Sequence, residues 1–152
     1  TPDPEPEPEP EVETEPEPEH EMDGESCWPL ETIGCGQTRS NDTTDFGPSN
    51  ITFYSCSTMY ESGPEIAYTF VAPQSGSVTA NLFPTTYVHN IDLFLLEDVG
   101  DGCNANQCLD EGHSYSTWEE ITWDAVAGQT YYLLVDGFSQ ADGPFELSLT
   151  CE

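Results

Sequence analysis

The stretch Gln129-Thr130-Tyr131-Tyr132-Leu133-Leu134-Val135-Asp136-Gly137 indicates the fold of this 152-residue chain most directly. Its aromatic and β-branched residues favour a strand. Gly128 comes directly before this stretch and Gly137 ends it. Large apolar side chains would point to both faces of such a strand, so only a central position in a packed sheet can bury them. We therefore predict a sheet centred on this strand.

Shorter strand-like runs lie on either side of it. They alternate or cluster apolar residues and are separated by turn signals such as Gly63-Pro64, and no stretch has useful helical periodicity. This pattern predicts an all-β fold for residues 27–152: an antiparallel, jelly-roll-like β-sandwich of about seven or eight strands. Besides a loop-rich first segment and a long loop at 97–116, the expected elements are an edge strand at 51–56 and strands at 66–71, 78–82, 91–96, 118–123 and 145–149.

Residues 1–26 form a separate low-complexity tail. Every odd position from Asp3 to Glu25 is Asp or Glu. With few apolar residues, the tail cannot build a core, and its prolines and mutually repelling carboxylates favour an extended polyproline II spacer. The prolines that begin its even positions are Pro2, Pro4, Pro6, Pro8 and Pro10.

The period of two allows a second interpretation of the tail. In an extended strand the missing N–H donors of these five prolines would all lie along one edge. The tail could then pair with the sheet edge of a neighbouring subunit without offering a further edge for growth. Prolines packing on aromatic residues such as Trp28 or Tyr60 would help to hold this inter-subunit strap. The spacer and strap interpretations both remain open at this point.

The charge of the chain is strongly one-sided. Thirty acidic residues face one basic residue, Arg39, and the formal net charge is −29. Phosphate binding rests on clustered Lys and Arg, so nucleic acids and anionic membranes are poor partners, whereas divalent cations and basic surfaces suit the chain better. No apolar run is long enough for a transmembrane segment and no signal peptide is present, as expected of a mature, processed chain.

All six cysteines follow the tail. An even number in a chain of short strands and polar loops is typical of an exported, oxidised protein, and the spacings do not fit a zinc site. Six cysteines allow fifteen pairing schemes. We expect Cys103–Cys108 across a tight loop, Cys35–Cys56 between the first segment and its strand, and Cys27–Cys151 between the ends of the body.

The sequence contains no recognisable catalytic motif. Its three histidines are His20, His89 and His113, and His113-Ser114 places a base beside a nucleophile only by adjacency in a loop. G-x-S-x-G, H-E-x-x-H and phosphate-binding glycine loops do not occur. The sequence therefore predicts a protein that is not an enzyme and requires no cofactor.

Calcium is the ion that this composition favours, because it takes about six to eight oxygen ligands. Asp92 and Asp136 are candidates because each interrupts an otherwise apolar strand. Either could instead lie on a solvent face, lie at a sheet end, or accept hydrogen bonds from nearby backbone N–H groups. The loop at 98–106 offers further candidates, although it is not an EF-hand: Asp98, Asp101, Asn104 and Asn106.

Aromatic residues are numerous for a small sandwich. Stacking on sugar rings is one use for an exposed aromatic side chain, whereas most such residues belong to a core or an interface. The residues considered for sugar stacking are Trp28, Trp118, Trp123, Tyr60, Tyr87 and Tyr115.

Several short motifs occur in a fixed order in the body. They are Cys35-Gly36, Tyr54-Ser55-Cys56, Gly63-Pro64-Glu65-Ile66-Ala67-Tyr68-Thr69-Phe70, Ile91-Asp92-Leu93-Phe94-Leu95, the tight loop from Cys103 to Cys108, Ala127-Gly128-Gln129-Thr130-Tyr131-Tyr132, Val135-Asp136-Gly137 and Leu149-Thr150-Cys151. Together they resemble the bacterial pre-peptidase C-terminal domain, in its disulfide-containing variant from secreted and surface proteins. The resemblance implies a jelly-roll-like sandwich without catalytic activity that usually accompanies exported hydrolases.

The resemblance also bears on partners. Related collagen-binding domains of bacterial collagenases bind calcium through an acidic N-terminal linker, whereas here the domain follows an acidic tail without an attached peptidase domain. We expect a non-catalytic interaction or structural module, extracellular or on the bacterial cell surface, that self-associates into a fibre or array with the tail as strap or spacer. The alternative is an accessory module of a secreted hydrolase that binds a glycan or a protein.

Overall fold

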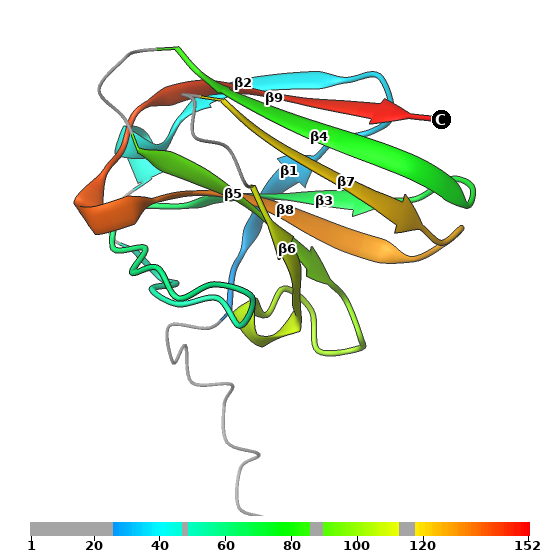
Figure 1. Cartoon of the computed structure of the whole chain (residues 1–152), viewed down its shortest axis with the longest axis horizontal. Coiled ribbons are helices and arrows are strands. Elements are labelled where there is room, and N and C mark those ends of the chain that lie inside the picture. The colour runs from blue at the N-terminus through cyan, green and yellow to red at the C-terminus, as the bar shows by residue number, and fades with distance from the viewer. Residues whose placement is uncertain (1–25, 47–48, 86–89, 113–117) are drawn as a thin grey trace, which may run out of the picture.

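Two packed β-sheets form the body of the protein in the computed structural model, which describes residues 26–46, 49–85, 90–112 and 118–152 (Figure 1). One sheet contains β1 (Pro29–Thr32), β3 (Ile66–Val71), β8 (Thr130–Gly137), β5 (Ile91–Glu97) and β6 (Cys108–Glu111), in that order. The other contains β2 (Thr38–Asp42), β9 (Pro144–Cys151), β4 (Gly76–Pro84) and β7 (Glu119–Ala125). Short 3₁₀ turns are η1 (Thr43–Phe46), η2 (Ala105–Gln107) and η3 (Phe138–Gln140).

β8 lies at the centre of the five-stranded sheet, as its two apolar faces require. It pairs antiparallel with β3 on one side and β5 on the other. Leu133 faces the core between the sheets, whereas Leu134 belongs to a second apolar cluster on the opposite face. The strand ends at Gly137, where a Cβ atom would overlap the backbone carbonyl of Ala141. The predicted central strand is confirmed.

The main core fills the space between the two sheets. Its largest fully buried side chains include Tyr68, Phe70 and Phe145, and the rings of Tyr68 and Phe145 meet edge to face with centroids 6.5 Å apart. Alternate residues of β4 point into this core, among them Ala80 and Leu82. The four-stranded sheet therefore has one apolar and one polar face, as expected for a sheet packed on one side.

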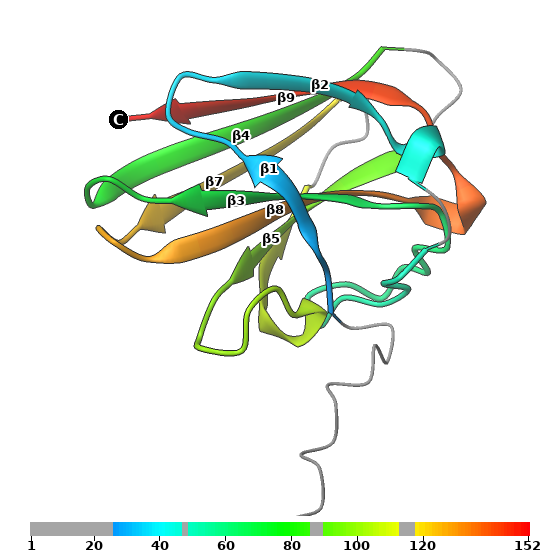
Figure 2. The same ribbon diagram turned by 180° about the vertical axis from the view of Figure 1, so that it is seen from behind.

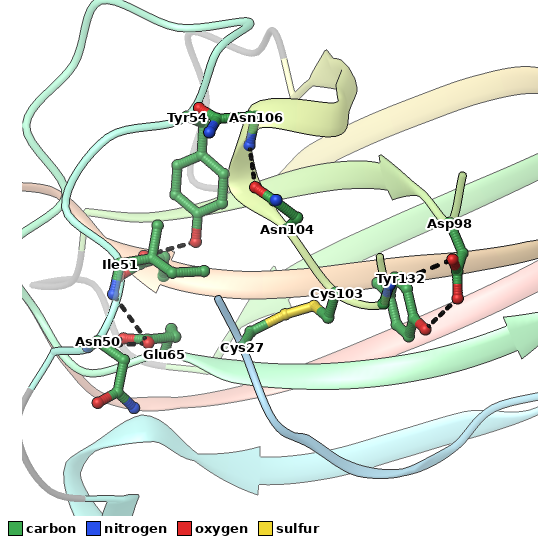
Figure 3. The surroundings of a disulfide bond; sticks show 12 residues. Cys27, Asn50, Ile51, Tyr54, Glu65, Asp98, Cys103, Asn104, Asn106 and Tyr132 are labelled. Atoms are coloured by element: carbon green, nitrogen blue, oxygen red, sulfur yellow. Dashed lines mark hydrogen bonds between the residues drawn. A yellow bond between two sulfur atoms is a disulfide. The ribbon is translucent and has the colours of Figure 1, made fainter. Parts of the chain in front are cut away.

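A loop layer covers the outer face of the five-stranded sheet. Residues 50–65 and 98–108 lie below this sheet in Figure 1. They bury Ile51 and Tyr54 against the sheet, and the Tyr54 ring stacks on Phe94 of β5 at a centroid distance of 3.7 Å. Figure 3 shows this layer around the disulfide Cys27–Cys103. Both faces of β8 are thus buried.

The predicted β-sandwich is confirmed, but three strands lie where loops were expected. The described residues form nine strands rather than seven or eight. β1 and β2 occupy the first segment and β6 the long loop; all three are short edge strands, and β1 is exposed along its whole length. They lack apolar alternation because they bury little. β1 also pairs parallel to β3 (Figure 2), an exception to the antiparallel prediction.

The predicted edge strand at 51–56 is wrong. This segment is irregular and belongs to the loop layer, where Ser55 N donates to Ala105 O at 3.0 Å and Glu61 N donates to Thr52 O at 2.8 Å. Its buried residues are Ile51 and Tyr54, three positions apart. That spacing does not fit a strand with one buried face, in which every second residue points inward.

The six cysteines are all paired, but every predicted partner is wrong. The disulfides are Cys27–Cys103, Cys35–Cys151 and Cys56–Cys108, with Cα–Cα distances of 5.2, 5.4 and 5.3 Å. Cys35 meets Cys151 because the chain entering β2 runs beside β9, where Gly36 N donates to Leu149 O. The other two disulfides tie the loop layer together. These pairings depend on sheet order, which cysteine spacing does not determine.

The acidic tail up to Glu25, with its five spaced prolines, lies outside the described residues, so its boundary with the body stays a prediction. Within the described part of the chain, no helix has the length and apolar character that crossing a membrane requires.

Disulfide mapping tests the topology. Peptides from a non-reducing digest should contain Cys27–Cys103, Cys35–Cys151 and Cys56–Cys108. The double substitution Cys56→Ser/Cys108→Ser should lower the free energy of unfolding, measured in urea, by up to about 4 kcal/mol. The reason is that the disulfide closes a loop with a separation of 52 residues, and its loss gives the unfolded chain more conformational entropy. A Cys103–Cys108 peptide would contradict the structure.

Candidate functional site

The outer face of the four-stranded sheet is the one broad sheet face that no other described segment covers. On β4, Thr79, Asn81 and Phe83 alternate with the core residues and point outward. β9 and β7 alternate in the same way, so the outer face consists mainly of hydroxyl, amide and carboxylate side chains. Two hydroxyl pairs, Thr38–Ser148 at 2.9 Å and Thr79–Thr122 at 3.0 Å, join neighbouring strands across it.

An aromatic row crosses one end of this face. Glu146 of β9 is the register partner of Ser40 on one side and of Phe83 on the other. On β4 and β7 the last register pair is Leu82 and Glu119, so the next residues, Phe83 and Trp118, lie beside each other. The rings of Phe83 and Trp118 stack with centroids 6.1 Å apart and planes 26° apart. The two side chains are 43% and 41% exposed. We call Ser40, Glu146, Phe83 and Trp118 the aromatic row.

A hollow of about 400 Å³ adjoins the aromatic row. It shares Ser40 and Glu146 with the row, and Asp42, Asp45 and Thr85 also line it. Asp42 Oδ1 accepts a hydrogen bond from Thr44 N at 2.9 Å, which fixes the turn at the end of β2. The volume is within the range of small-molecule sites, about 300–1,000 Å³. Row and hollow together form a surface with aromatic rings at one end and hydrogen-bonding groups at the other.

The predicted aromatic candidates separate into different environments. Trp118 lies in the aromatic row, whereas Trp123 packs on the core and meets Phe70 edge to face at 6.0 Å. Trp28 and Tyr60 are exposed elsewhere, and Tyr87 and Tyr115 lie outside the described residues. The sequence analysis missed Phe83; the outward alternation at the end of β4 was the signal that could have identified it.

In the predicted calcium loop at 98–106, side-chain oxygens of Asp98, Asp101 and Asn104 accept hydrogen bonds from the loop itself or from β8. Asp98 accepts hydrogen bonds from Gly100 N at 2.8 Å and from the Tyr132 hydroxyl at 2.7 Å (Figure 3), and these bonds lower the pKa of Asp98. Asn104 Nδ2 donates to Asp101 at 3.0 Å, and Asn104 Oδ1 accepts from Asn106 N at 2.9 Å. Across the described ranges, no three His, Cys, Asp or Glu side chains are arranged to hold a metal ion.

The other two calcium candidates, Asp92 and Asp136, face each other on β5 and β8. Asp136 is fully buried and accepts hydrogen bonds from the Tyr54 hydroxyl and from Gly137 N, both at 2.7 Å. Its bond to Gly137 is the backbone alternative left open by the sequence. These bonds tie the loop layer to the centre of the sheet through Tyr54.

Two glutamates that the sequence did not single out complete a carboxyl cluster, defined as the buried Glu61, Glu119 and Asp136 together with the half-buried Asp92. Glu119 is 7% exposed and accepts a hydrogen bond from Leu93 N at 2.6 Å. Glu61 is fully buried, and neither of its carboxylate oxygens has a donor among the described residues. Of the two glutamates, only Glu119 could have been identified from the sequence, because it is two residues before Ile121 in a strand and therefore points to the same, inward side.

Burial dominates the electrostatics of this cluster. Burial first, and the neighbouring Asp92 carboxyl second, raise the pKa of Glu61 to about 11 and of Glu119 to about 10. Burial also raises the pKa of Asp136 well above its usual range. Asp92 is within hydrogen-bonding reach of Glu61 and Glu119, so a bond can form only when one member of each pair holds a proton.

No protein-family model and no curated protein matches the chain. Among solved structures, the pre-peptidase C-terminal domain of a Bacillus anthracis collagenase aligns with a TM-score of 0.55 and 17% identity, over 82% of this chain and 99% of that one. The surface-associated copper-binding protein CorA of Methylomicrobium album BG8 aligns at 0.50 and 6% identity, over 80% and 98%. A family 35 carbohydrate-binding module from an environmental isolate aligns at 0.38 and 13%, over 84% and 86%.

The first of these likenesses confirms the resemblance to the pre-peptidase C-terminal domain as a likeness of fold. Identities of 17% and below transfer no ligand or activity to this chain, because one fold serves many functions.

The carboxyl cluster predicts an unusual pH dependence in calcium-free buffer. Glu61 and Glu119 have folded-state pKa values of about 11 and about 10, above the ordinary value of 4.5. The folded state therefore binds more protons than the unfolded state between these limits, and stability falls as pH rises. The slope is at most about 1.4 kcal/mol per pH unit for each carboxyl. Melting curves from pH 5 to pH 9 with a chelator present should show a falling Tm, and a rising Tm would contradict this reading.

Proposed function

We propose that this chain is a non-catalytic interaction module, extracellular or on the bacterial cell surface, that binds a glycan on the outer face of its four-stranded sheet. The observation that carries the proposal is the stacked, exposed pair Phe83 and Trp118 beside a polar hollow. The three disulfides support an oxidising location outside the cytosol.

The chemistry of the face fits a sugar chain. Sugar rings present apolar C–H faces and many hydroxyl groups, so they are recognised by aromatic stacking together with polar acceptors and donors. Asn81 and Glu120 are register partners in the next line of the outer face and can bond hydroxyls of a sugar seated on the rings. A broad sheet face suits a polymer better than a small free sugar.

The charge selects among glycans. Glu146, Asp42 and Asp45 line the hollow, and the chain as a whole carries a formal charge of −29. Sulfated or uronic-acid polymers would therefore be repelled. Neutral polysaccharides and those with amino groups remain, and carboxylates are suitable acceptors for their hydroxyl and ammonium donors.

Binding to an array of neutral, amino and acidic polysaccharides tests this function. A neutral or amino polymer should bind, and Trp118→Ala and Phe83→Ala should each weaken that binding about two- to tenfold, because a lost stacking contact costs about 0.5–1.5 kcal/mol. The matched control is Trp28→Ala, which removes an exposed tryptophan far from the row. Equal loss in all three variants, or binding restricted to acidic polymers, would contradict the proposal.

A second candidate function is assembly into a fibre or array through the acidic tail. One observation favours it: apolar side chains are exposed at and just before the edge strand β1, where Trp28 and Leu30 are 68% and 47% exposed. β1 is an edge strand, and such an edge can pair with a further strand. The tail of a neighbouring subunit, with prolines spaced by two from Pro2 to Pro10, is the partner proposed for it. Tyr60 offers a further exposed ring for proline packing.

Deletion of residues 1–24 separates the two functions. Assembly, measured by light scattering and electron microscopy of the full chain in about millimolar calcium, should disappear on deletion because the strap is lost. Polysaccharide binding should remain, since the outer face is untouched. If the shortened chain forms the same particles at the same concentration, the tail is a spacer and the strap proposal is wrong.

A further inference from the structure

We propose that the carboxyl cluster is a calcium site in which Glu61, Asp92 and Glu119 bind the ion and Asp136 lies behind them. The site is independent of glycan binding on the outer face. It contains two of the calcium candidates that the sequence suggested, Asp92 and Asp136, and adds Glu61 and Glu119, whereas the 98–106 loop lies outside it.

The cluster lacks a compensating positive charge within the chain's described part. Arg39 is the chain's one Lys or Arg residue, and it lies elsewhere, bonded to Thr32 O at 3.1 Å and paired with Glu31 at 3.5 Å. Four carboxyl groups nevertheless converge: Asp92 and Asp136 are register partners on β5 and β8, Glu119 of β7 accepts from Leu93 N next to Asp92, and Glu61 reaches them from the loop layer. Buried carboxylates without a counter-charge are very costly, so a group of them needs either protons or a cation.

Glu61 points to a bound ligand. Its side chain is fully buried, both carboxylate oxygens lack a donor among the described residues, and its electrostatic neighbours are Asp92, Asp136 and Glu119. A buried acceptor without a partner destabilises a fold, and most native structures avoid it. The nearby Glu65 shows the contrast, since its carboxylate accepts hydrogen bonds from Asn50 N and Ile51 N (Figure 3). A cation among these side chains would use both free oxygens of Glu61.

The carboxyl groups are close together but not arranged as a cage, since no three described His, Cys, Asp or Glu side chains meet metal-binding geometry. In this arrangement Asp92 is within hydrogen-bonding reach of Glu61 and Glu119, a contact that shared protons stabilise. A cation would replace those protons and draw the carboxylates toward itself. Glutamate side chains can make this change by rotation about their χ angles, without any movement of the sheets.

Calcium suits these ligands better than other common divalent ions. The available donors are carboxylate oxygens, which are hard ligands, and Glu61, Asp92 and Glu119 supply up to six of the about six to eight oxygens that calcium takes. Zinc prefers nitrogen and sulfur ligands, whereas the three proposed ligands are all carboxylates. Magnesium demands near-ideal octahedral geometry and keeps its water, whereas calcium tolerates an irregular shell.

Thermal unfolding of the full chain, after removal of divalent ions with a chelator, tests the site. Calcium at about 2 mM should raise the Tm by about 5 °C or more, because an ion that binds only the folded state stabilises it. Magnesium at the same concentration should raise the Tm by less. Diffuse binding to the acidic tail would leave the Tm unchanged, since such binding does not distinguish the folded from the unfolded chain.

Two variants with the same charge change locate the ion. Glu61→Gln should remove most of the calcium-dependent rise in Tm, whereas Glu152→Gln, at the exposed C-terminus, should retain it. If Glu61→Gln does not fold, calorimetric titration of the unmodified chain decides, and one saturable calcium site per chain is expected. No saturable site, an unchanged Tm, or equal loss in both variants would overturn the proposal.

Discussion

The structure depends on the need to bury both faces of β8. Leu133 and Leu134 are adjacent in the chain and both fully buried, yet they point to opposite sides of the sheet. One side is covered by the four-stranded sheet and the other by the loop layer. Irregular loops cover a sheet less firmly than strands do, and the disulfides Cys27–Cys103 and Cys56–Cys108 lie where this weaker cover needs support.

This constraint also places the proposed function. Since the central strands β5 and β8 of the five-stranded sheet are covered on both faces, the broad sheet face left for a partner is the outer face of the four-stranded sheet, with Phe83 and Trp118 at one end. The polar alternation of β4 and β9 then has two roles: it closes the core on one side and presents hydrogen-bonding groups on the other. The one-sided charge restricts partners further, toward neutral or cationic ligands and metal ions.

The sequence predicted those strands whose apolar residues follow a recognisable local pattern. Apolar alternation located β3, β4, β5, β7, β8 and β9, and the two-sided stretch from Thr130 to Asp136 identified the central strand. It missed β1, β2 and β6, because edge strands with exposed side chains leave no periodic signal. The disulfide partners were wrong because Cys35 and Cys151 meet only through the order of strands in a sheet.

The candidate sites show the same division. Trp118 and Asp136 could be singled out from the sequence as unusual residues. Strand alternation marked Phe83 as outward and Glu119 as inward, but it did not show which residues they meet, and no pattern indicated Glu61. Phe83 lies beside Trp118 because two strands pair in one particular register, and Glu61 reaches the cluster from the loop layer. Such partners come from segments distant in the chain, so they become visible only in the folded structure.

Amide hydrogen exchange of the full chain, with and without a saturating polysaccharide from the array, tests most directly whether the outer face is the binding surface. Bound polymer should slow exchange at the ends of β4, β7 and β9 that surround Phe83, Trp118 and Glu146, and leave the loop layer unchanged. Slower exchange confined to residues 50–65 and 98–108, with no change on the outer face, would contradict it.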